Sequence, residues 1–166
     1  MIPSTLEYTK ATSIDEAIAA VQAGARPLAG GQSLLPMMRL RLAAPGAVVD
    51  LGGVAELVGV CEDGEEIAVG AMTPHRAVAA DPLIGEHCRL VAQAASGVGS
   101  LVIRGRGTIG GSLAHADPHG DLPAAILAAG GSVIARRWNF AYADCALPFG
   151  RRTCVMISSS ARDVVR

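Results

Sequence analysis

Residues 13 to 53 alternate between helical and strand-like apolar patterns, and this alternation restricts the possible fold more than any other feature of the chain. The stretch TSIDEAIAAVQAG repeats apolar residues at helical spacing on one face, at Ile14, Ala17, Ile18 and Val21. Ser13 can cap this helix, Glu16 completes a capping box, and Gly24 is suited to ending it. We therefore predict a helix that starts just after Ser13.

The rest of this region continues the alternation. RPLAG is typical of a short buried strand, SLLPMMRLRLAAP of a short helix with Pro36 in its first turn, and GAVVDLGG of another strand. The order helix–strand–helix–strand predicts a small α/β lobe over residues 1–53, with Gly52 and Gly53 at its boundary.

Residues 54–135 show a different mixture of patterns. LVGVCEDGEEIAVGAM predicts a hairpin with EDGE as its turn, and two helical stretches follow, broken at Asp81-Pro82. Beyond them we expect a strand at LVIR, a glycine loop, a strand or turn, a helix from Leu122 and a last strand. The expected fold class is therefore α+β, built from two α/β lobes.

Composition excludes several classes of protein. The chain has 166 residues, 51% of them hydrophobic, with a net charge of −1, which argues against disorder and against nucleic-acid binding. The N-terminus lacks the apolar region of a signal peptide, and no apolar run is long enough for a membrane span. The four cysteines form no CxxC pair, so we expect neither zinc nor iron–sulfur ligation. We expect buried or free thiols in a reducing cytoplasm.

The composition changes after residue 135. Four of the five aromatic residues of the chain lie there, namely Trp138, Phe140, Tyr142 and Phe149. The segment 136–166 is also rich in arginine and has no clean helical or strand period. Two interpretations stay open: a genuine C-terminal extension, or the product of a truncated or frame-shifted reading frame.

Two glycine pairs share one design. AGGQS at 29–33 and TIGGS at 108–112 each place Gly-Gly after an apolar segment and before a small polar side chain. Because glycine tolerates positive φ, such a pair can turn successive N–H groups toward an anion. One such motif alone is more often an ordinary turn. Two of them favour the two phosphates of a dinucleotide, although neither is a P-loop or a GxGxxG motif.

The segment HADPHGD after the second motif allows further interpretations. His115, Asp117 and His119 have a spacing that could align them for a metal, but Pro118 and Gly120 interrupt a regular strand, so no metal site is predicted. Asp121 precedes LPAAIL and can cap that helix, either as a cap alone or as a cap that also contacts a ligand.

Two histidines and two arginines elsewhere in the chain are the other polar residues that we interpret. We expect His75 near a helix start and at the surface, and His87 partly buried in a helix. Arg104 and Arg106 precede the second motif, where they could be solvated or could serve a phosphate or a partner subunit, and their position favours the second.

The stretches PLAGGQSLLPMMRLRLAAPGAVVDL and IRGRGTIGGSLAHADPHGDLPAAILA closely resemble the FAD-binding medium subunit of the molybdenum hydroxylases, the carbon monoxide dehydrogenase and xanthine dehydrogenase family. The resemblance covers about residues 1 to 135. It implies the FAD-binding domain fold shared with vanillyl-alcohol oxidases, with two subdomains around the flavin. It departs from the family at Gly105, where family members often carry asparagine, and after residue 135.

The resemblance also implies which residues contact FAD. The first motif would wrap the pyrophosphate with backbone amides, the second would hold the other side, and Val98, His115 and Asp121 match positions along the cofactor. The implied cofactor-binding set is Leu28, Ala29, Gly30, Gly31, Gln32, Ser33, Leu34, Leu35, Val98, Thr108, Ile109, Gly110, Gly111, Ser112, His115 and Asp121. No residue of this chain is expected to act as a catalytic acid or base.

The implied role is electron transfer inside a larger enzyme. In such an enzyme a molybdopterin-containing large subunit oxidises the substrate, and a small subunit carries 2Fe–2S clusters. The medium subunit passes electrons through FAD to NAD or a quinone-type acceptor. Two alternatives stay open: a remnant or assembly module that binds only the ADP or pyrophosphate part of a nucleotide, and a binder of a different nucleotide.

Overall fold

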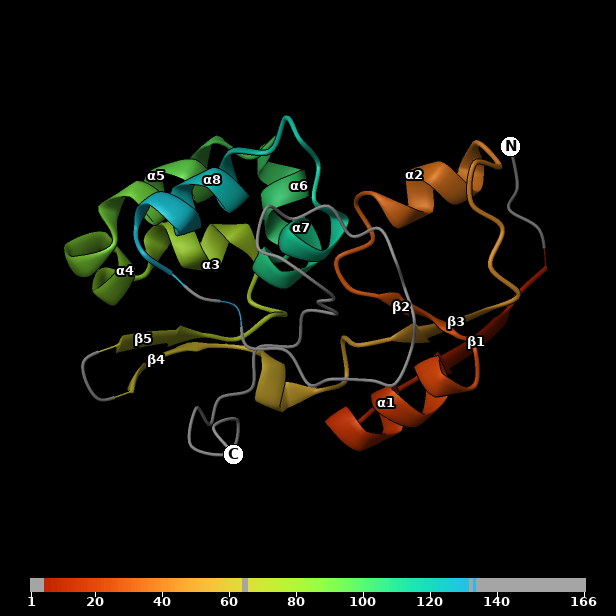
Figure 1. Cartoon of the computed structure of the whole chain (residues 1–166). Helices are drawn as coiled ribbons and strands as arrows, with labels where there is room; N and C mark the ends of the chain where they lie inside the picture. The colour runs from red at the N-terminus through yellow and green to blue at the C-terminus, as the bar shows by residue number, and fades with distance from the viewer. Residues whose placement is uncertain (1–4, 64–65, 132, 134–166) are drawn as a thin grey trace.

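The computed structural model describes residues 5–63, 66–131 and 133, and its first part is a three-stranded parallel sheet with two helices (Figure 1). The strands are β1 (Glu7–Lys10), β2 (Arg26–Leu28) and β3 (Ala47–Asp50), in the order β1-β3-β2. Helices α1 (Ile14–Gln22) and α2 (Leu34–Arg39) lie on opposite sides of the sheet. The predicted order of helix, strand, helix and strand is confirmed.

The start and end of α1 follow the predicted capping chemistry. The Ser13 side chain accepts a hydrogen bond from the Glu16 amide, and the Glu16 carboxylate accepts from the amide and hydroxyl of Thr12, each at 2.8 Å. These hydrogen bonds lower the pKa of Glu16. Gly24 has a φ of +100°, the left-handed conformation that ends many helices.

Strand β1 was not predicted. All four of its side chains are exposed, so the sequence shows no alternation of buried and exposed positions there. The strand is defined by its pairing with β3, in which Tyr8 lies opposite Val48. The Tyr8 hydroxyl donates to the Asp50 carboxylate at 2.6 Å, and this hydrogen bond raises the pKa of Tyr8.

The second part combines a hairpin with six helices (Figure 1). A short 3-10 helix, η1 (Ala55–Leu57), precedes the antiparallel strands β4 (Val60–Asp63) and β5 (Glu66–Val69). The helices are α3 (His75–Ala80), α4 (Pro82–His87), α5 (Arg89–Gly97), α6 (Leu101–Arg106), α7 (Ile109–His115) and α8 (Asp121–Ala128). The predicted hairpin and the helix break at Asp81-Pro82 are confirmed, with Asp81 capping α4.

Three predictions in this part are wrong. The run LVIR is helical rather than a strand, because the Ser100 side chain caps α6 at the amide of Ile103 and leaves Leu101 and Val102 exposed. The glycine loop and the following strand or turn are replaced by α7. Asp121 is the first residue of α8 rather than its cap, since the cap position belongs to Gly120.

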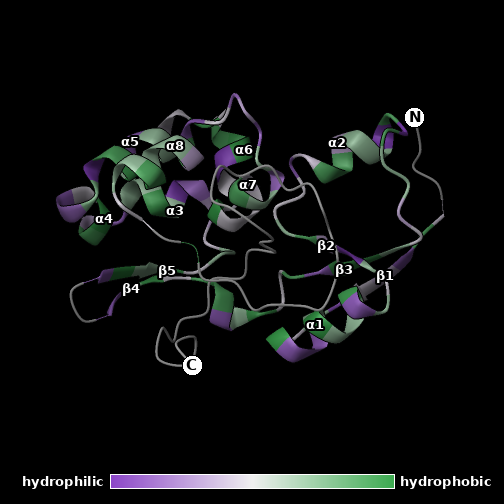
Figure 2. Cartoon of the chain, in the orientation of Figure 1, coloured by the Kyte–Doolittle hydropathy of each residue, from purple (hydrophilic) through white to green (hydrophobic). Residues whose placement is uncertain are grey.

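Two hydrophobic clusters form the core, and Figure 2 shows the apolar residues along the helices and strands that supply them. The first joins the sheet and α1 to the segments on either side of the hairpin, through Ala11, Ala17, Val49, Leu51, Val54, Leu57 and Met72. The second lies among the helices, at Val78, Ile84, Val91, Ala92, Ala95, Ile109, Leu113 and Leu122. Together the two clusters hold both glycine motifs on packed elements.

Some predictions lie outside the described residues. These are the hairpin turn at residues 64–65, the last strand beyond Val133 and everything expected of the segment 136–166. Among the residues that the structure describes, no helix is long and apolar enough to cross a membrane.

The cap of α1 gives a test of this part of the fold. We expect Ser13→Ala to lower the free energy of unfolding by about 1 kcal/mol, because the Glu16 amide loses its acceptor. Ser96→Ala in the last turn of α5 is a matched control, since its hydroxyl bonds only to a carbonyl three residues back in the same helix. Urea unfolding measures both; equal stability of the two variants would contradict the assigned cap.

Candidate functional site

The first glycine motif is a tight turn between β2 and α2. Leu28 ends the strand, Gly31 takes a φ of +74°, and the helix begins at Leu34. Within the described part of the chain, the backbone N–H groups of residues 30–34 donate no hydrogen bond. These adjacent amides are therefore available as donors, and their role as an anion-binding nest stays a prediction.

Gly30 is required for a different reason, the close approach of two backbones. A Cβ atom at Gly30 would collide with the carbonyl oxygen of Arg106 and would lie 2.8 Å from the Cα atom of Gly107. The first motif thus packs directly against the chain that leads into the second. No side chain larger than hydrogen fits between them.

The second glycine motif is the first turn of α7, and its amides are already used. The amide of Ile109 donates to Thr73 O at 3.0 Å, and that of Gly110 donates to Ala71 O at 2.9 Å. Those of Gly111 and Ser112 donate to the side chain and the carbonyl of Thr108. The expectation that this motif presents free amides is therefore wrong, because the helix and its cap occupy them.

The glycines of the second motif instead permit close packing on both sides. A Cβ at Gly110 would lie 2.6 Å from the Cβ of Ala71, and one at Gly111 would lie 2.8 Å from Thr108 Oγ1 and 3.5 Å from the Cβ of Ala29. Ala29 belongs to the first motif. The structure therefore brings together two motifs that lie almost eighty residues apart in the sequence, as Figure 1 shows for the start of α7 and the turn before α2.

A buried histidine lies against the second motif. His75, expected at the surface, is only 1% exposed, and its Nε2 atom lies 3.0 Å from Ser112 Oγ. Its Nδ1 atom is buried and has no hydrogen-bond partner. Burial lowers the pKa of His75, so the imidazole is neutral at neutral pH. The surface prediction failed because α3 packs its first turn beneath the chain at Gly107.

The two arginines before the second motif differ in role. Arg104 donates from Nη1 to the carbonyl oxygens of Val98 and Gly99, at 3.0 and 2.8 Å, and so holds the turn between α5 and α6. Arg106 is exposed, and among the described residues its guanidinium has no hydrogen bond or ion pair. A positive charge without a partner therefore lies on the residue whose carbonyl contacts the first motif.

The remaining predicted cofactor contacts lie on separate elements. Val98 follows α5 and packs against the second hydrophobic cluster, His115 is the last residue of α7, and Asp121 is the first of α8. His115 and Asp121 are exposed. No side-chain hydrogen bond in the described part of the chain links these two residues to either glycine motif, so their contact with a cofactor stays a prediction.

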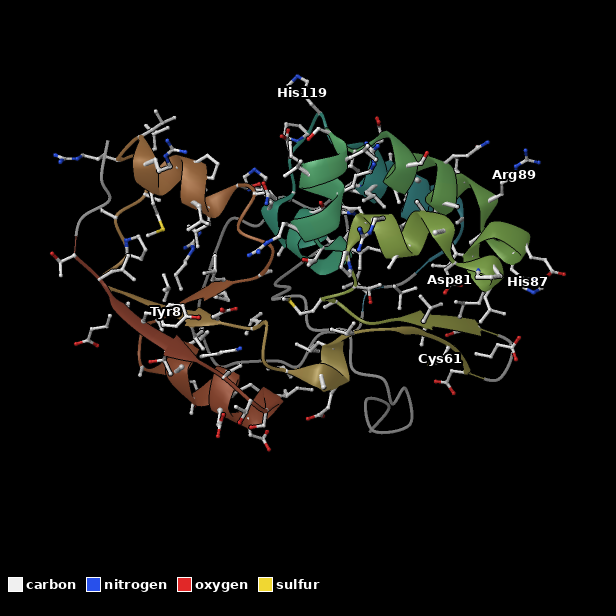
Figure 3. The ribbon with its side chains drawn as sticks, turned by 180° about the vertical axis from the view of Figure 1, so that it is seen from behind. Tyr8, Cys61, Asp81, His87, Arg89 and His119 are labelled. Atoms are coloured by element: carbon white, nitrogen blue, oxygen red, sulfur yellow. The ribbon has the colours of Figure 1, made fainter. Side chains whose placement is uncertain are left out.

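The segment HADPHGD does not assemble a metal centre. His119 is 94% exposed and pairs with Asp117 at 3.5 Å, and Figure 3 shows it projecting from the molecule. The His119 amide donates to the Asp117 carboxylate and lowers its pKa. Within residues 5–63, 66–131 and 133, no group of three or more His, Cys, Asp or Glu could hold a metal. His87, expected partly buried, is exposed at the end of α4.

Sequence reasoning missed Thr73 and the burial of His75, although it included Thr108 in the implied cofactor-binding set. Thr73, His75 and Thr108 are buried, and Thr73 Oγ1 bonds to both the amide and the carbonyl of Gly59. The spacing of Thr73 and His75 around Pro74 was the available signal, because alternate residues of an extended segment share one face. Burial of that face, however, depends on α6 and α7, which the sequence did not predict as helices.

The fold is a mixed α/β domain, and comparison with known proteins identifies its family. Residues 4–139 match the family described as the FAD binding domain in molybdopterin dehydrogenase, and the chain belongs to this family. It is 42% identical over 131 residues to the carbon monoxide dehydrogenase medium chain of Hydrogenophaga pseudoflava. It is 38% identical over 130 residues to the nicotine 6-hydroxylase medium subunit of Paenarthrobacter nicotinovorans. The resemblance stated from the sequence is confirmed.

Comparison with solved structures supports the same family. Carbon monoxide dehydrogenase from Hydrogenophaga pseudoflava superimposes with a TM-score of 0.72 at 43% identity, over 75% of this chain and 44% of that one. Quinoline 2-oxidoreductase from Pseudomonas putida 86 gives 0.71 at 36% identity, over 74% and 44%. The two curated relatives are matched over 77% of this chain and 46% of their own length, so the chain spans less than half of each.

The contact between the motifs can be tested at Gly30. We expect Gly30→Ala to lower the free energy of unfolding by about 1–3 kcal/mol, because the new methyl group overlaps the Arg106 carbonyl. Gly85→Ala is a matched control inside α4 with nothing within 4 Å, and it should raise stability by about 0.5–1 kcal/mol. Chemical denaturation compares them, and a Gly30→Ala protein as stable as the control would disprove the close approach.

The buried imidazole predicts a pH dependence. The unfolded chain protonates His75 more readily than the folded one, so stability is complete above the ordinary histidine pKa and declines as the pH falls below it. We expect His75→Leu to flatten this part of the profile of unfolding free energy against pH. The measurement is urea unfolding between about pH 5 and 8. A variant with an unchanged slope would show that His75 does not contribute.

Proposed function

We propose that this chain binds FAD and that the first glycine motif holds its pyrophosphate. The observation that carries the proposal is the row of N–H groups at residues 30–34, which have no acceptor among the described residues and surround a glycine of positive φ. Adjacent amide donors at a strand end match the needs of a phosphate group, which brings several acceptor oxygens and negative charge. The exposed guanidinium of Arg106 adds a positive charge on the neighbouring segment.

The second motif contributes differently in this proposal. With its amides donated internally, it offers the Ser112 hydroxyl and a surface without Cβ atoms at Gly110 and Gly111. The proposed contact set comprises Leu28 to Leu35, Val98, Thr108 to Ser112, His115 and Asp121. Family membership supports FAD as the ligand. When bound, FAD supplies the redox chemistry, while the residues of this chain bind and orient it.

We propose two subdomains on either side of the cofactor, residues 1–53 and 54–135. The two hydrophobic clusters support this division, since one gathers the parallel sheet and the other the helices. Val54, Leu57 and Met72 nevertheless pack with the first cluster. The first subdomain therefore also includes η1, and the chain contributes to it once more at Met72, just before α3.

We further propose that the chain acts as the FAD-binding part of a molybdopterin-dependent hydroxylase or dehydrogenase. Electrons would pass from the 2Fe–2S clusters of a small subunit through FAD to NAD or a quinone-type acceptor. A molybdopterin-containing large subunit would oxidise the substrate. Homology to medium chains of multisubunit oxidoreductases supports this assignment.

A second candidate function is a module that binds only the ADP or pyrophosphate part of a nucleotide. The observation that favours it is that the N–H groups of residues 30–34, which have no acceptor within the described part of the chain, suit phosphate. Competition distinguishes the two. ADP that displaces FAD with equal affinity would favour the module, whereas much tighter binding of FAD would favour the flavoprotein.

Gly31 provides the sharpest test of FAD binding. We expect the full chain to bind FAD and Gly31→Val to weaken binding by about tenfold or more, because a branched residue resists a φ of +74° and its Cβ would lie 2.8 Å from Leu35 Cδ1. Gly24→Val is the matched control, with a φ of +100° at the end of α1 and open space around it. Flavin fluorescence measures the dissociation constant.

The control separates strain from ligand contact. Both variants pay for a left-handed conformation, so both should lose some stability, but only Gly31→Val should lose affinity. Equal FAD affinity for the two variants would contradict the assignment of the first motif. No binding by the unmodified chain, with or without co-expressed large and small subunits, would contradict the proposed function.

A further inference from the structure

The pair formed by His75 and Ser112 has a property that the binding of FAD by glycine motifs does not explain. His75 is almost completely buried, yet only one of its two ring nitrogens has a hydrogen-bond partner. Leaving a buried polar atom unpaired costs about 1–3 kcal/mol. An apolar side chain of similar size would avoid that cost, so the histidine needs a reason beyond filling space.

The unpaired nitrogen indicates where the ring proton lies. A neutral imidazole has one donor nitrogen and one acceptor nitrogen. An unpaired buried N–H is rarer in proteins than an under-used acceptor, which favours the lone pair on Nδ1 and the proton on Nε2. The lowered pKa of His75 keeps the ring neutral and so preserves this arrangement. In that tautomer the Nε2–H group is the donor to Ser112 Oγ, which lies 3.0 Å away.

This donation determines what the serine hydroxyl can do. With one lone pair of Oγ accepting from the imidazole, the hydroxyl proton must point elsewhere. A helical serine commonly turns it back to the carbonyl four residues earlier, here Thr108. Among the described residues Ser112 makes no such bond, and its only side-chain partner is His75. The hydroxyl proton is therefore available at the half-buried start of α7, one residue after Gly111.

We propose that His75 is a positioning residue that fixes the Ser112 hydroxyl as a hydrogen-bond donor toward an acceptor oxygen of the bound flavin nucleotide. The inference rests on the proposed function, because the acceptor belongs to FAD. It assigns the second motif a specific polar contact, which its amides no longer supply. Ser112 makes the contact, and His75 acts only through it.

The direction of the hydrogen bond can be tested without cofactor. Nitrogen-15 NMR of the imidazole rings in the full chain distinguishes the two neutral tautomers, and the His75 signals are those that His75→Leu removes. We expect the Nε2–H tautomer at neutral pH. Detection of the Nδ1–H tautomer, or of a protonated ring, would overturn the proposal even if FAD binds as proposed.

The effect on the cofactor is tested with a double-mutant cycle on FAD affinity. We expect His75→Leu to weaken FAD binding about three- to tenfold, the range of one neutral hydrogen bond, and to have no effect in a Ser112→Ala background. His75→Gln, which can keep a donor near the Nε2 position, should restore most of the affinity. His87→Leu, in the exposed last turn of α4, is the control and should leave affinity unchanged.

Any other result of the double-mutant cycle contradicts the positioning role of His75. An equal loss from His75→Leu with and without the serine hydroxyl would mean that the histidine only supports the fold, and no loss at all would mean that it does not act on the cofactor. Either result overturns the positioning role while leaving FAD binding in place. If the unmodified chain binds no FAD, the proposed function fails and this inference fails with it.

Discussion

The contact between two backbones at Gly30 is the constraint on which the site depends. The first motif, carried by the parallel sheet, approaches the carbonyl of Arg106 closely enough to exclude any Cβ atom. Gly110 makes a similar approach to Ala71 on the other side of α7. Because packed interiors do not deform to admit even one methyl group without cost, these glycines fix the distance between the sheet and the helices. The amide donors of the first motif acquire their position from that distance.

The two motifs look alike in sequence but solve different physical problems. In the first, Gly31 takes a positive φ, and the N–H groups of residues 30–34 have no acceptor within the described part of the chain. In the second, the amides of residues 109–112 complete the start of α7 and its cap, and the glycines serve packing. A Gly-Gly pair followed by a small polar residue therefore does not by itself identify an anion-binding nest. What distinguishes the two motifs is whether the adjacent amides stay free, and that depends on whether a capped helix begins there.

The sequence was sufficient to predict elements whose signals are local. The capped helix α1, strands β2 and β3, the hairpin and the break at Asp81 all follow from capping residues, periodicity or turn chemistry. Strand β1 was missed because its side chains are all exposed. The run LVIR in α6 was mistaken for a strand because its apolar, β-branched residues are typical of a buried strand, whereas Leu101 and Val102 are exposed. Strand β1 depends on its tertiary pairing with β3, which overrides local propensity, whereas α6 had a local signal, the Ser100 cap, that was overlooked.

In the site, too, residues with a local sequence signal could be predicted, and residues whose placement depends on tertiary contacts could not. Both glycine motifs could be found in the sequence, but His75 could not be placed, because its burial depends on α6, α7 and the chain at Gly107 together. Its unpaired nitrogen is a cost of about 1–3 kcal/mol against a total stability that for most domains is about 5–15 kcal/mol. A fold that relied on His75 for stability alone would be better served by leucine. The cost is understandable if the partnered nitrogen fixes a hydroxyl at the point where a ligand must be recognised, since an oriented donor is worth more to binding than a freely rotating one.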